Sequence, residues 1–348
     1  MKKILLPMAM VLALTAFCAA RGAAEIVKSD IYVGGKNGYA IYRIPAIVTT
    51  AKGTTLAFTE ARKNGPADAG DIDLVVKRSF DSGATWDEMR VIYDNGGHTI
   101  GNPSPVFDPD TGEIVLLFNE DNDKVLVTSS ADEGATWSAP RDITKDVKPA
   151  DWDWYAMGPG HAIRLRTGRL LVPCDHKTGN VQYSHVIYSD DHGKTWKLGG
   201  SVHKQTDEAT VVELSDGSVM INMRNYYLKG MRAVSVSKDG GLTWSKPKFQ
   251  HDLVEPVCEG SILRFDTDRI LFSNPASRIR EKMTVKMSRD DGHTWPVAKL
   301  VNKGLSGYSD MAVLPDGTVG ILYENGSKAY YEKITFAKFD IEWLTEKD

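Results

Sequence analysis

An eight-residue pattern, Ser-x-Asp-x-Gly-x-Thr-Trp, occurs five times along this chain of 348 residues. The copies occupy residues 79–86, 130–137, 189–196, 237–244 and 288–295, so the period is about 50 residues. In each copy we expect the Asp to accept backbone N–H bonds, the Gly to supply a positive φ, and the Trp to fold back over the hairpin. Such a period, built of short apolar runs between glycine turns, indicates a propeller or a solenoid and argues against a single sandwich.

A second turn signal, followed directly by an apolar strand, recurs at positions offset from the first pattern. It occurs six times and therefore indicates six repeating units. These turns lie at Gly53, Gly112, Gly168, Gly217, Asp268-Arg269 and Gly317. No unit resembles a capping repeat, which disfavours the solenoid. We expect the run Lys333–Phe339 to pair with the N-terminal region, since closing the ring removes the exposed edge strands. The sequence therefore predicts an all-β fold, a six-bladed β-propeller with four antiparallel strands per blade and five turns of the first kind, here called Asp-box turns.

The first 24 residues carry Lys2 and Lys3 before an apolar stretch from Ile4 to Phe17, followed by small residues. This pattern is typical of a secretory signal peptide, so we predict a signal over residues 1–24 and a single domain over residues 25–348. The protein is then expected to be exported and to be periplasmic, secreted or on the outer surface. Two alternatives stay open for the segment, a helix packed on the domain and a lipid anchor at Cys18. No later run approaches ~18 apolar residues, so no membrane span is expected.

The composition narrows the classes of partner. The chain has 42 basic and 46 acidic residues, a net charge of −4, and no Lys/Arg run, which argues against nucleic acid or an anionic membrane surface as the main partner. After residue 24 the cysteines are Cys174 and Cys258, for which we favour two buried thiols over a disulfide. No CxxC or HxxxH spacing suggests a metal site. We expect a monomer.

The phase of the early turns predicts where a site lies. Because the strands on either side of each turn are antiparallel, residues about seven to ten positions away should converge on one face beside the central channel. That set comprises Arg43 and Arg62 around Gly53, Glu208 and Arg224 around Gly217, and Tyr308 and Glu324 around Gly317, with Asp68, Asp71 and Arg280 from following loops. Four arginines in one funnel of an acidic chain indicate an anion site, because the planar Arg fork holds a carboxylate in two hydrogen bonds and keeps its charge.

The motifs around these residues carry a family resemblance. They are Tyr42-Arg43-Ile44-Pro45, Glu60-Ala61-Arg62, Gly70-Asp71-Ile72-Asp73-Leu74, Asp207-Glu208-Ala209, Asn222-Met223-Arg224, Ser277-Arg278-Ile279-Arg280 and Gly307-Tyr308-Ser309-Asp310. Together with the Asp-box turns, they make the chain resemble the exo-α-sialidases, in particular the bacterial secreted ones, over essentially everything after residue 24. The resemblance implies a six-bladed propeller that removes terminal α-linked sialic acids from glycoproteins, glycolipids or oligosaccharides with no metal or organic cofactor.

Carried over residue by residue, the resemblance implies that three arginines clamp the carboxylate of sialic acid. These would be Arg43, Arg224 and Arg280, with Glu324 supporting Arg43. Arg62 would line the pocket beside the catalytic acid, near the 4-position of the sugar.

The resemblance also implies a retaining reaction in which Tyr308 is the nucleophile, Glu208 its base and Asp68 the general acid and base. A neutral phenol avoids the repulsion that a carboxylate nucleophile would meet from the carboxylate of the sugar, and sialidases with a Tyr nucleophile are an exception to the two-carboxylate scheme of glycosidases. We prefer Asp68 to Asp71 and Asp73 as the acid, because Asp71 and Asp73 begin the next strand while Asp68 sits in the mobile part of the loop.

Weaker candidates share the phase or lie in neighbouring loops. Asn102, His161 and Glu259 occupy the same phase in the other three units, and Asp151-Trp152-Asp153-Trp154-Tyr155 either offers aromatic faces to sugar rings or packs on the propeller. Asp121-Asn122-Asp123 resembles a calcium cluster only faintly, and His192 and His293 lie inside structural turns.

Three other functions stay open. A non-catalytic, lectin-like propeller would keep the arginines but lose Tyr308, Glu208 or the acid, and all are present. A trans-sialidase and an anhydro-forming enzyme would use the same residues with a different access of water.

Overall fold

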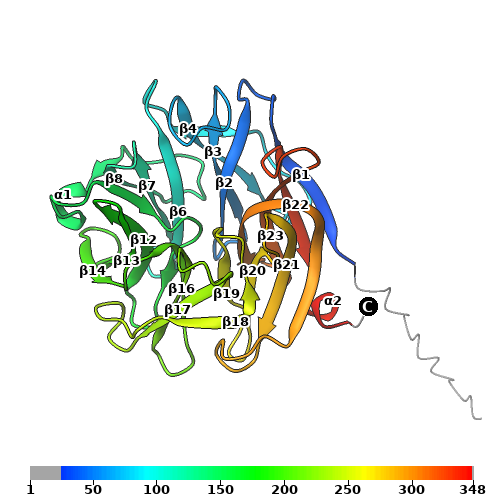
Figure 1. Ribbon diagram of the computed structural model, residues 1–348. Coiled ribbons are helices and arrows are strands. Elements are labelled where there is room, and N and C mark those ends of the chain that lie inside the picture. The colour runs from blue at the N-terminus through cyan, green and yellow to red at the C-terminus, as the bar shows by residue number, and fades with distance from the viewer. Residues whose placement is uncertain (1–24, 347–348) are drawn as a thin grey trace, which may run out of the picture.

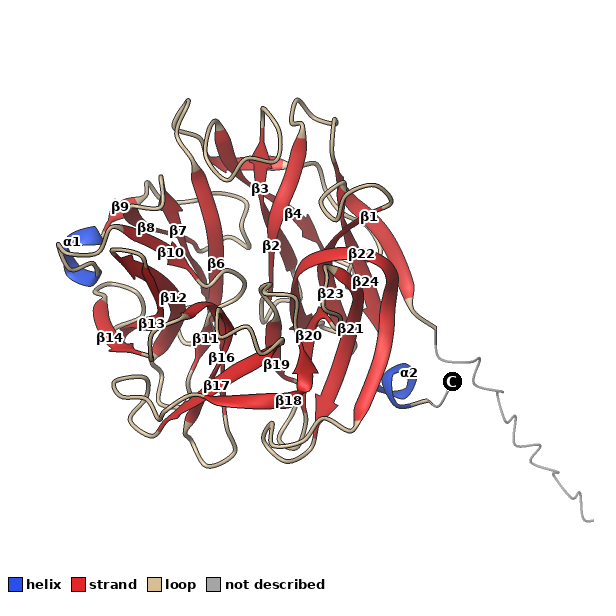
Figure 2. Cartoon of the chain, in the orientation of Figure 1, coloured by secondary structure: helices blue, strands red, loops and turns tan. Residues whose placement is uncertain are grey.

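The computed structural model describes residues 25–346, whose regular secondary structure is almost entirely β-strand. Five antiparallel sheets follow one another along the chain and stand side by side around a centre, a propeller-like arrangement (Figures 1 and 2). The all-β prediction is therefore confirmed. The predicted signal peptide over residues 1–24 lies outside the described residues, and the assignment of residues 25–348 to a single domain stays a prediction.

The middle of the chain, from β2 to β18, forms four of the five sheets. The first contains β2 (Ile41–Thr49), β3 (Thr55–Arg62), β4 (Ile72–Ser79) and β5 (Arg90–Tyr93). The second contains β6 (Ile100–Asp108), β7 (Glu113–Glu120), β8 (Lys124–Ser130) and β9 (Arg141–Asp142). The third contains β10 (Trp154–Met157), β11 (Ile163–Arg164), β12 (Leu170–Thr178), β13 (Val181–Ser189) and β14 (Lys197–Ser201). The fourth contains β15 (Thr206–Glu213), β16 (Val219–Asn225), β17 (Met231–Ser237) and β18 (Lys248–Val254).

The fifth sheet has seven strands and joins the two ends of the described chain. Its order is β1 (Val27–Val33), β24 (Lys333–Phe339), β23 (Val319–Gly326), β22 (Val297–Val313), β21 (Glu281–Ser288), β20 (Ile270–Pro275) and β19 (Ser261–Arg264). The antiparallel pairing of β1 with β24 confirms that the run Lys333–Phe339 pairs with the N-terminal region. The helices α1 (Thr144–Val147) and α2 (Ile341–Thr345) are one turn each.

The seven-stranded sheet departs from the predicted four strands per blade because β22 is long. From Val297 to Leu305 this strand pairs with β21, and from Leu305 to Val313 it pairs with β23. One unbroken strand of 17 residues thus links two sets of strands that the sequence predicted as separate sheets.

The five Asp-box turns share one hydrogen-bond pattern. In the turn of residues 130–137, Ser130 Oγ donates to Asp132 Oδ1 at 2.8 Å and Gly134 N donates to Ser130 Oγ at 2.9 Å. Thr136 N and Thr136 Oγ1 donate to the two oxygens of Asp132 at 2.9 and 2.6 Å. The other four turns repeat these bonds. The glycine at the fifth position of each turn has a positive φ. The expected roles of Asp and Gly in these turns are confirmed.

The tryptophans of the turns reach farther than the expected packing over their own hairpin. Trp137 packs edge-on against Phe58 of the preceding sheet, and Trp86 packs edge-on against Phe336 of the fifth sheet. The apolar core is divided accordingly, into clusters that lie between neighbouring sheets. Cys174 and Cys258 are buried free thiols, as predicted. Within residues 25–346 no helix has the length and apolar character needed to cross a membrane.

Candidate active site

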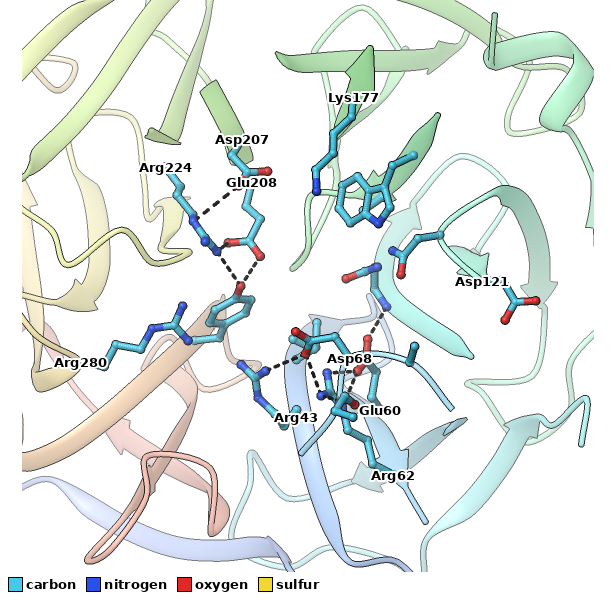
Figure 3. A pocket seen from close by; sticks show the side chains of 18 of the residues that line it. Arg43, Glu60, Arg62, Asp68, Asp121, Lys177, Asp207, Glu208, Arg224 and Arg280 are labelled. Carbon is cyan, nitrogen blue, oxygen red and sulfur yellow. Dashed lines mark hydrogen bonds and ion pairs between the residues drawn. The ribbon is translucent and has the colours of Figure 1, made fainter. Parts of the chain in front are cut away.

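A cavity of about 730 Å³ opens where the inner strands of the sheets begin (Figure 3). Seven of the eight predicted site residues line it: Arg43, Arg62, Asp68, Glu208, Arg224, Arg280 and Tyr308. The eighth, Glu324, is fully buried behind Arg43. The structure therefore brings these eight residues together from β2, β3, β15, β16, β22, β23 and two loops.

Backbone irregularities at the cavity end of the inner strands aim these side chains. The pairing register shifts between Arg43 and Ala46, and equivalent shifts occur in β6, in β15 and in β22. Such bulges twist a strand and redirect its side chains. Within the first, Ile44 has a φ of +60°. This conformation is an outlier for a β-branched residue and costs about 1–3 kcal/mol, so neighbouring contacts must hold it.

Glu324 supplies those contacts. Its Oε1 accepts from Arg43 Nε and Ile44 N, both at 3.0 Å, and its Oε2 accepts from Arg43 Nη2 at 3.3 Å and Tyr308 N at 3.1 Å. One buried carboxylate thus compensates the charge of Arg43, holds the strained bulge and ties β2 to β22. The sequence suggested only the first of these roles.

Tyr308, Glu208 and Arg224 form a hydrogen-bonded group at the base of the cavity. The Tyr308 hydroxyl donates to Glu208 Oε1, while Arg224 Nη1 donates to Glu208 Oε2 at 2.7 Å and to the Tyr308 hydroxyl at 3.1 Å. Burial, reinforced by the charge of Glu208, raises the pKa of Tyr308 well above its ordinary value. The phenol is therefore neutral, with a carboxylate placed to take its proton and a guanidinium beside its oxygen.

Arg43 and Arg280 flank the same tyrosine. The guanidinium of Arg43 lies 5.2 Å and that of Arg280 lies 5.3 Å from the centre of the Tyr308 ring. Within the described part of the chain no carboxylate pairs with Arg280, whose hydrogen bond to Val257 O is 3.5 Å long. Its donors are consequently available to an anion in the cavity, to which Arg43 and Arg224 present further positive charge.

Asp68 and Asp71 occupy different environments, although they are three residues apart. Asp68 lines the cavity with 83% of its side chain exposed, and it accepts from Arg62 Nη1 at 2.8 Å and Arg43 Nη1 at 3.2 Å. Asp71 pairs with Lys63 at 2.8 Å and is absent from the cavity lining. Desolvation alone would raise the pKa of Asp68, but the hydrogen bond and charge of Arg62, with the charges of Arg43 and Arg280, bring it below its ordinary value.

Arg62 holds the loop that carries Asp68. Besides its bond to Asp68, Arg62 Nη1 donates to the carbonyl oxygens of Pro66 at 2.7 Å and Ala67 at 2.9 Å. Its Nε and Nη2 donate to Glu60 Oε2 at 3.0 and 2.6 Å. Arg62 therefore sets the position of the exposed carboxyl as well as lining the cavity.

The weaker candidates separate into cavity and core. Asn102, Asp121, Asn122 and Trp154 line the cavity. His161 instead bonds Asp310 and lines a second cavity, of about 820 Å³, at the turn end of the inner strands. Glu259 is buried and accepts from Ser309 N at 2.9 Å. Trp152 and Tyr155 pack in the core, so the segment of residues 151–155 both packs and offers one aromatic face.

Other polar candidates have structural partners. His192 bonds Asp108 at 2.7 Å, and His293 bonds the carbonyl oxygen of Asp290, as expected for residues of structural turns. Asp121 lies in a group with His98 and Glu120 that could hold a cation. Glu120 of that group already pairs with Lys124 at 2.6 Å. We therefore assign no metal ion to the group.

Sequence reasoning missed several residues of the cavity. Tyr226 accepts from Arg224 Nη2 at 3.0 Å and donates to Asp207 Oδ2 at 2.6 Å. It stands two residues after Arg224, one residue beyond the end of β16, and the two-residue spacing places it on the same side as Arg224, which was a usable signal. Lys177, whose ammonium group lies 4.8 Å from the centre of the Trp154 ring, and Tyr330 come from loops or strand ends with no repeat phase.

Comparisons with known proteins agree with this geometry. The BNR repeat-like domain family matches residues 53–321. A sialidase of Micromonospora viridifaciens is 36% identical over 91% of this chain, which spans 54% of that protein. An exo-alpha-sialidase of Aspergillus fumigatus is 32% identical over 88% of this chain and 86% of its own length.

Among solved structures, the Hadza microbial sialidase Hz136 superposes with a TM-score of 0.84 at 32% identity. The superposition covers 91% of this chain and 69% of that one. A BNR repeat-like domain over most of the described chain, relatives above 30% identity and a shared fold agree: the protein belongs to the sialidase family.

Proposed function

We propose that this protein is an exo-α-sialidase, which hydrolyses terminal α-ketosidically linked sialic acids of glycoproteins, glycolipids or oligosaccharides. The observation that carries the proposal is the contact of Tyr308 with Glu208 beneath three converging arginines. An exposed second carboxyl, Asp68, stands at the edge of the same cavity. Names of relatives support the activity class, and the residues of this chain supply the chemistry.

The proposed reaction has two displacements with retention. Arg43, Arg224 and Arg280 hold the carboxylate of the sugar, while the Tyr308 oxygen attacks the anomeric carbon and Glu208 takes the phenolic proton. The bond to the leaving oxygen breaks as Asp68 protonates that oxygen. Asp68 then removes a proton from water, which attacks the anomeric carbon, and the tyrosyl oxygen leaves and regains its proton from Glu208.

Three further assignments belong to the proposal. We infer that the ring has six blades, because the halves of β22 belong to two strand sets, β19–β20–β21 and β23–β24–β1. The enzyme acts as a monomer and is exported, the latter on the strength of residues 1–24. The sialylated glycan is its macromolecular partner.

A fluorogenic α-sialoside tests the function. We expect release of free sialic acid, with the α-anomer as the first product in proton NMR. Tyr308→Phe should reduce kcat by orders of magnitude. Tyr330→Phe, at another tyrosine of the cavity, serves as the matched control and should retain most of the activity. No release at any pH between about 4 and 8 would overturn the proposal, and a transfer or anhydro product would assign the same site to one of the alternative reactions.

A further inference from the structure

Asp175 is a buried acid next to the site that the proposed reaction does not use. It lies on β12, its relative exposure is 0%, and neither of its carboxyl oxygens meets a hydrogen-bond donor within the described residues. An ionised carboxylate without a donor is among the costliest groups that an interior can hold. The Asp175 side chain is therefore either protonated, or ionised with an uncompensated desolvation free energy.

The groups that face Asp175 decide between these two states. They are Tyr155 from β10, Asp207 and Glu208 from β15, and Arg224 from β16, together with Cys174 on its own strand. Among them, Asp207 is tied to the position of Asp175 through Ser184, which pairs with Asp175 on the neighbouring strand and donates its hydroxyl to the Asp207 carbonyl oxygen. The carboxyl group of Asp207 faces that of Asp175. Two carboxyl groups in contact in a dry interior share one proton, because both cannot ionise. Burial, and then the charge of Asp207, raise the pKa of Asp175 well above its ordinary value.

Asp207 is the acceptor of the pair because its other side-chain partners are donors. Its Oδ2 accepts from the Tyr226 hydroxyl at 2.6 Å and lies 3.6 Å from Arg224 Nε. Arg224 Nη2 in turn donates to the Tyr226 hydroxyl at 3.0 Å. The Arg224 guanidinium therefore has Asp207 and Tyr226 along one edge. On its other edge, Nη1 donates to Glu208 and to the Tyr308 hydroxyl. Figure 3 shows Arg224 beside Asp207 and Glu208.

We propose that Asp175 is a protonated acid that donates a hydrogen bond to Asp207 and thereby positions Arg224 beside the Tyr308 hydroxyl. Without this donor, Asp207 would turn its charge toward Arg224 and draw the guanidinium away from Tyr308. Loss of the shared proton would have the same effect, since a second charge would then stand next to Asp207. Asp175 is a positioning residue, and its effect on turnover rests on the proposed function, whereas its protonation does not.

Infrared spectroscopy of the full chain at pH 7 tests the protonation. The spectrum should contain the carbonyl stretching band of protonated carboxyl groups, to which buried Glu259, whose pKa is also raised by burial, can contribute, and Asp175→Asn should lower its intensity by one carboxyl group. Asp151→Asn makes the same change at an exposed aspartate of the neighbouring segment and should leave the band in place. A band of unchanged intensity in Asp175→Asn overturns the inference, whether or not the protein cleaves sialosides.

Kinetics test the positioning. Asp175→Asn keeps a donor in the form of an amide N–H, so its kcat/KM should stay within about threefold of the parent value. Asp175→Ala should lower kcat/KM about tenfold or more, because Asp207 then loses its hydrogen-bond donor. The decline of activity at alkaline pH that comes from the second ionisation of the pair should be absent in Asp175→Asn. Equal losses in the two variants, or an unchanged alkaline limb, would overturn the positioning role.

Discussion

Glu324→Gln is the substitution that most directly probes how the site is held. Each oxygen of the carboxylate accepts two bonds, and all four donors are N–H groups of Arg43, Ile44 and Tyr308. A glutamine offers one oxygen and one NH₂ group. In either orientation of the amide, the NH₂ group would face two donors, and the charge of Arg43 would lose its buried partner.

The size of the effect follows from burial. Glu324 is 0% and Arg43 is 6% exposed, so solvent screens their interaction little. Removing one partner of such a buried pair costs about 3–5 kcal/mol. At about 2 cal/mol/K of unfolding entropy per residue, this loss corresponds to a decrease in Tm of about 4–7 °C for a chain of this length. We expect KM to rise as well, because Arg43 would no longer be aligned for a substrate carboxylate.

Thermal unfolding and steady-state kinetics measure the two consequences. Glu88→Gln provides the matched control, since it makes the same chemical change at an exposed glutamate. If the Tm of Glu324→Gln fell within about 1 °C of that of the control, the reasoning would be refuted, because the buried charge of Glu324 would then contribute no measurable stability.

Two further predictions concern the acid and the Asp-box turns. Asp68→Ala should reduce kcat/KM more for a sialoside with a poor leaving group than for one with a good one, whereas Asp71→Ala should affect both alike; the reverse pattern would transfer the acid role to Asp71. Gly134→Ala should be more destabilising than Gly112→Ala by about 1–3 kcal/mol, measured by denaturant unfolding. Both glycines have a φ near +74°, but only at Gly134 would the new Cβ meet a buried atom, 2.3 Å from Leu56 Cδ2. Equal losses would mean that backbone strain alone sets the cost.

The turn phase located the site because it depends only on local geometry. Counting from Gly53 and Gly217 along antiparallel strands placed Arg43, Arg62 and Arg224 at one end, where the structure has them. The same count failed for His161, which has the correct phase but bonds Asp310 and faces the second cavity. The distance in sequence from a turn predicts how far along the strand a residue lies. The direction in which its side chain points depends on the bends of that strand in the folded protein.

The sequence by itself determined the repeating turns, the closing pair of strands and the set of charged residues at one end of the sheets. These features follow from strand periodicity and from turn chemistry, which act between residues close in the chain. The tertiary structure alone decided that Glu324 holds Tyr308 as well as Arg43, and that Asp175 lies beside Asp207. The physical reason is that these contacts join strands or loops whose spacing depends on how neighbouring sheets pack, a property that no local pattern encodes.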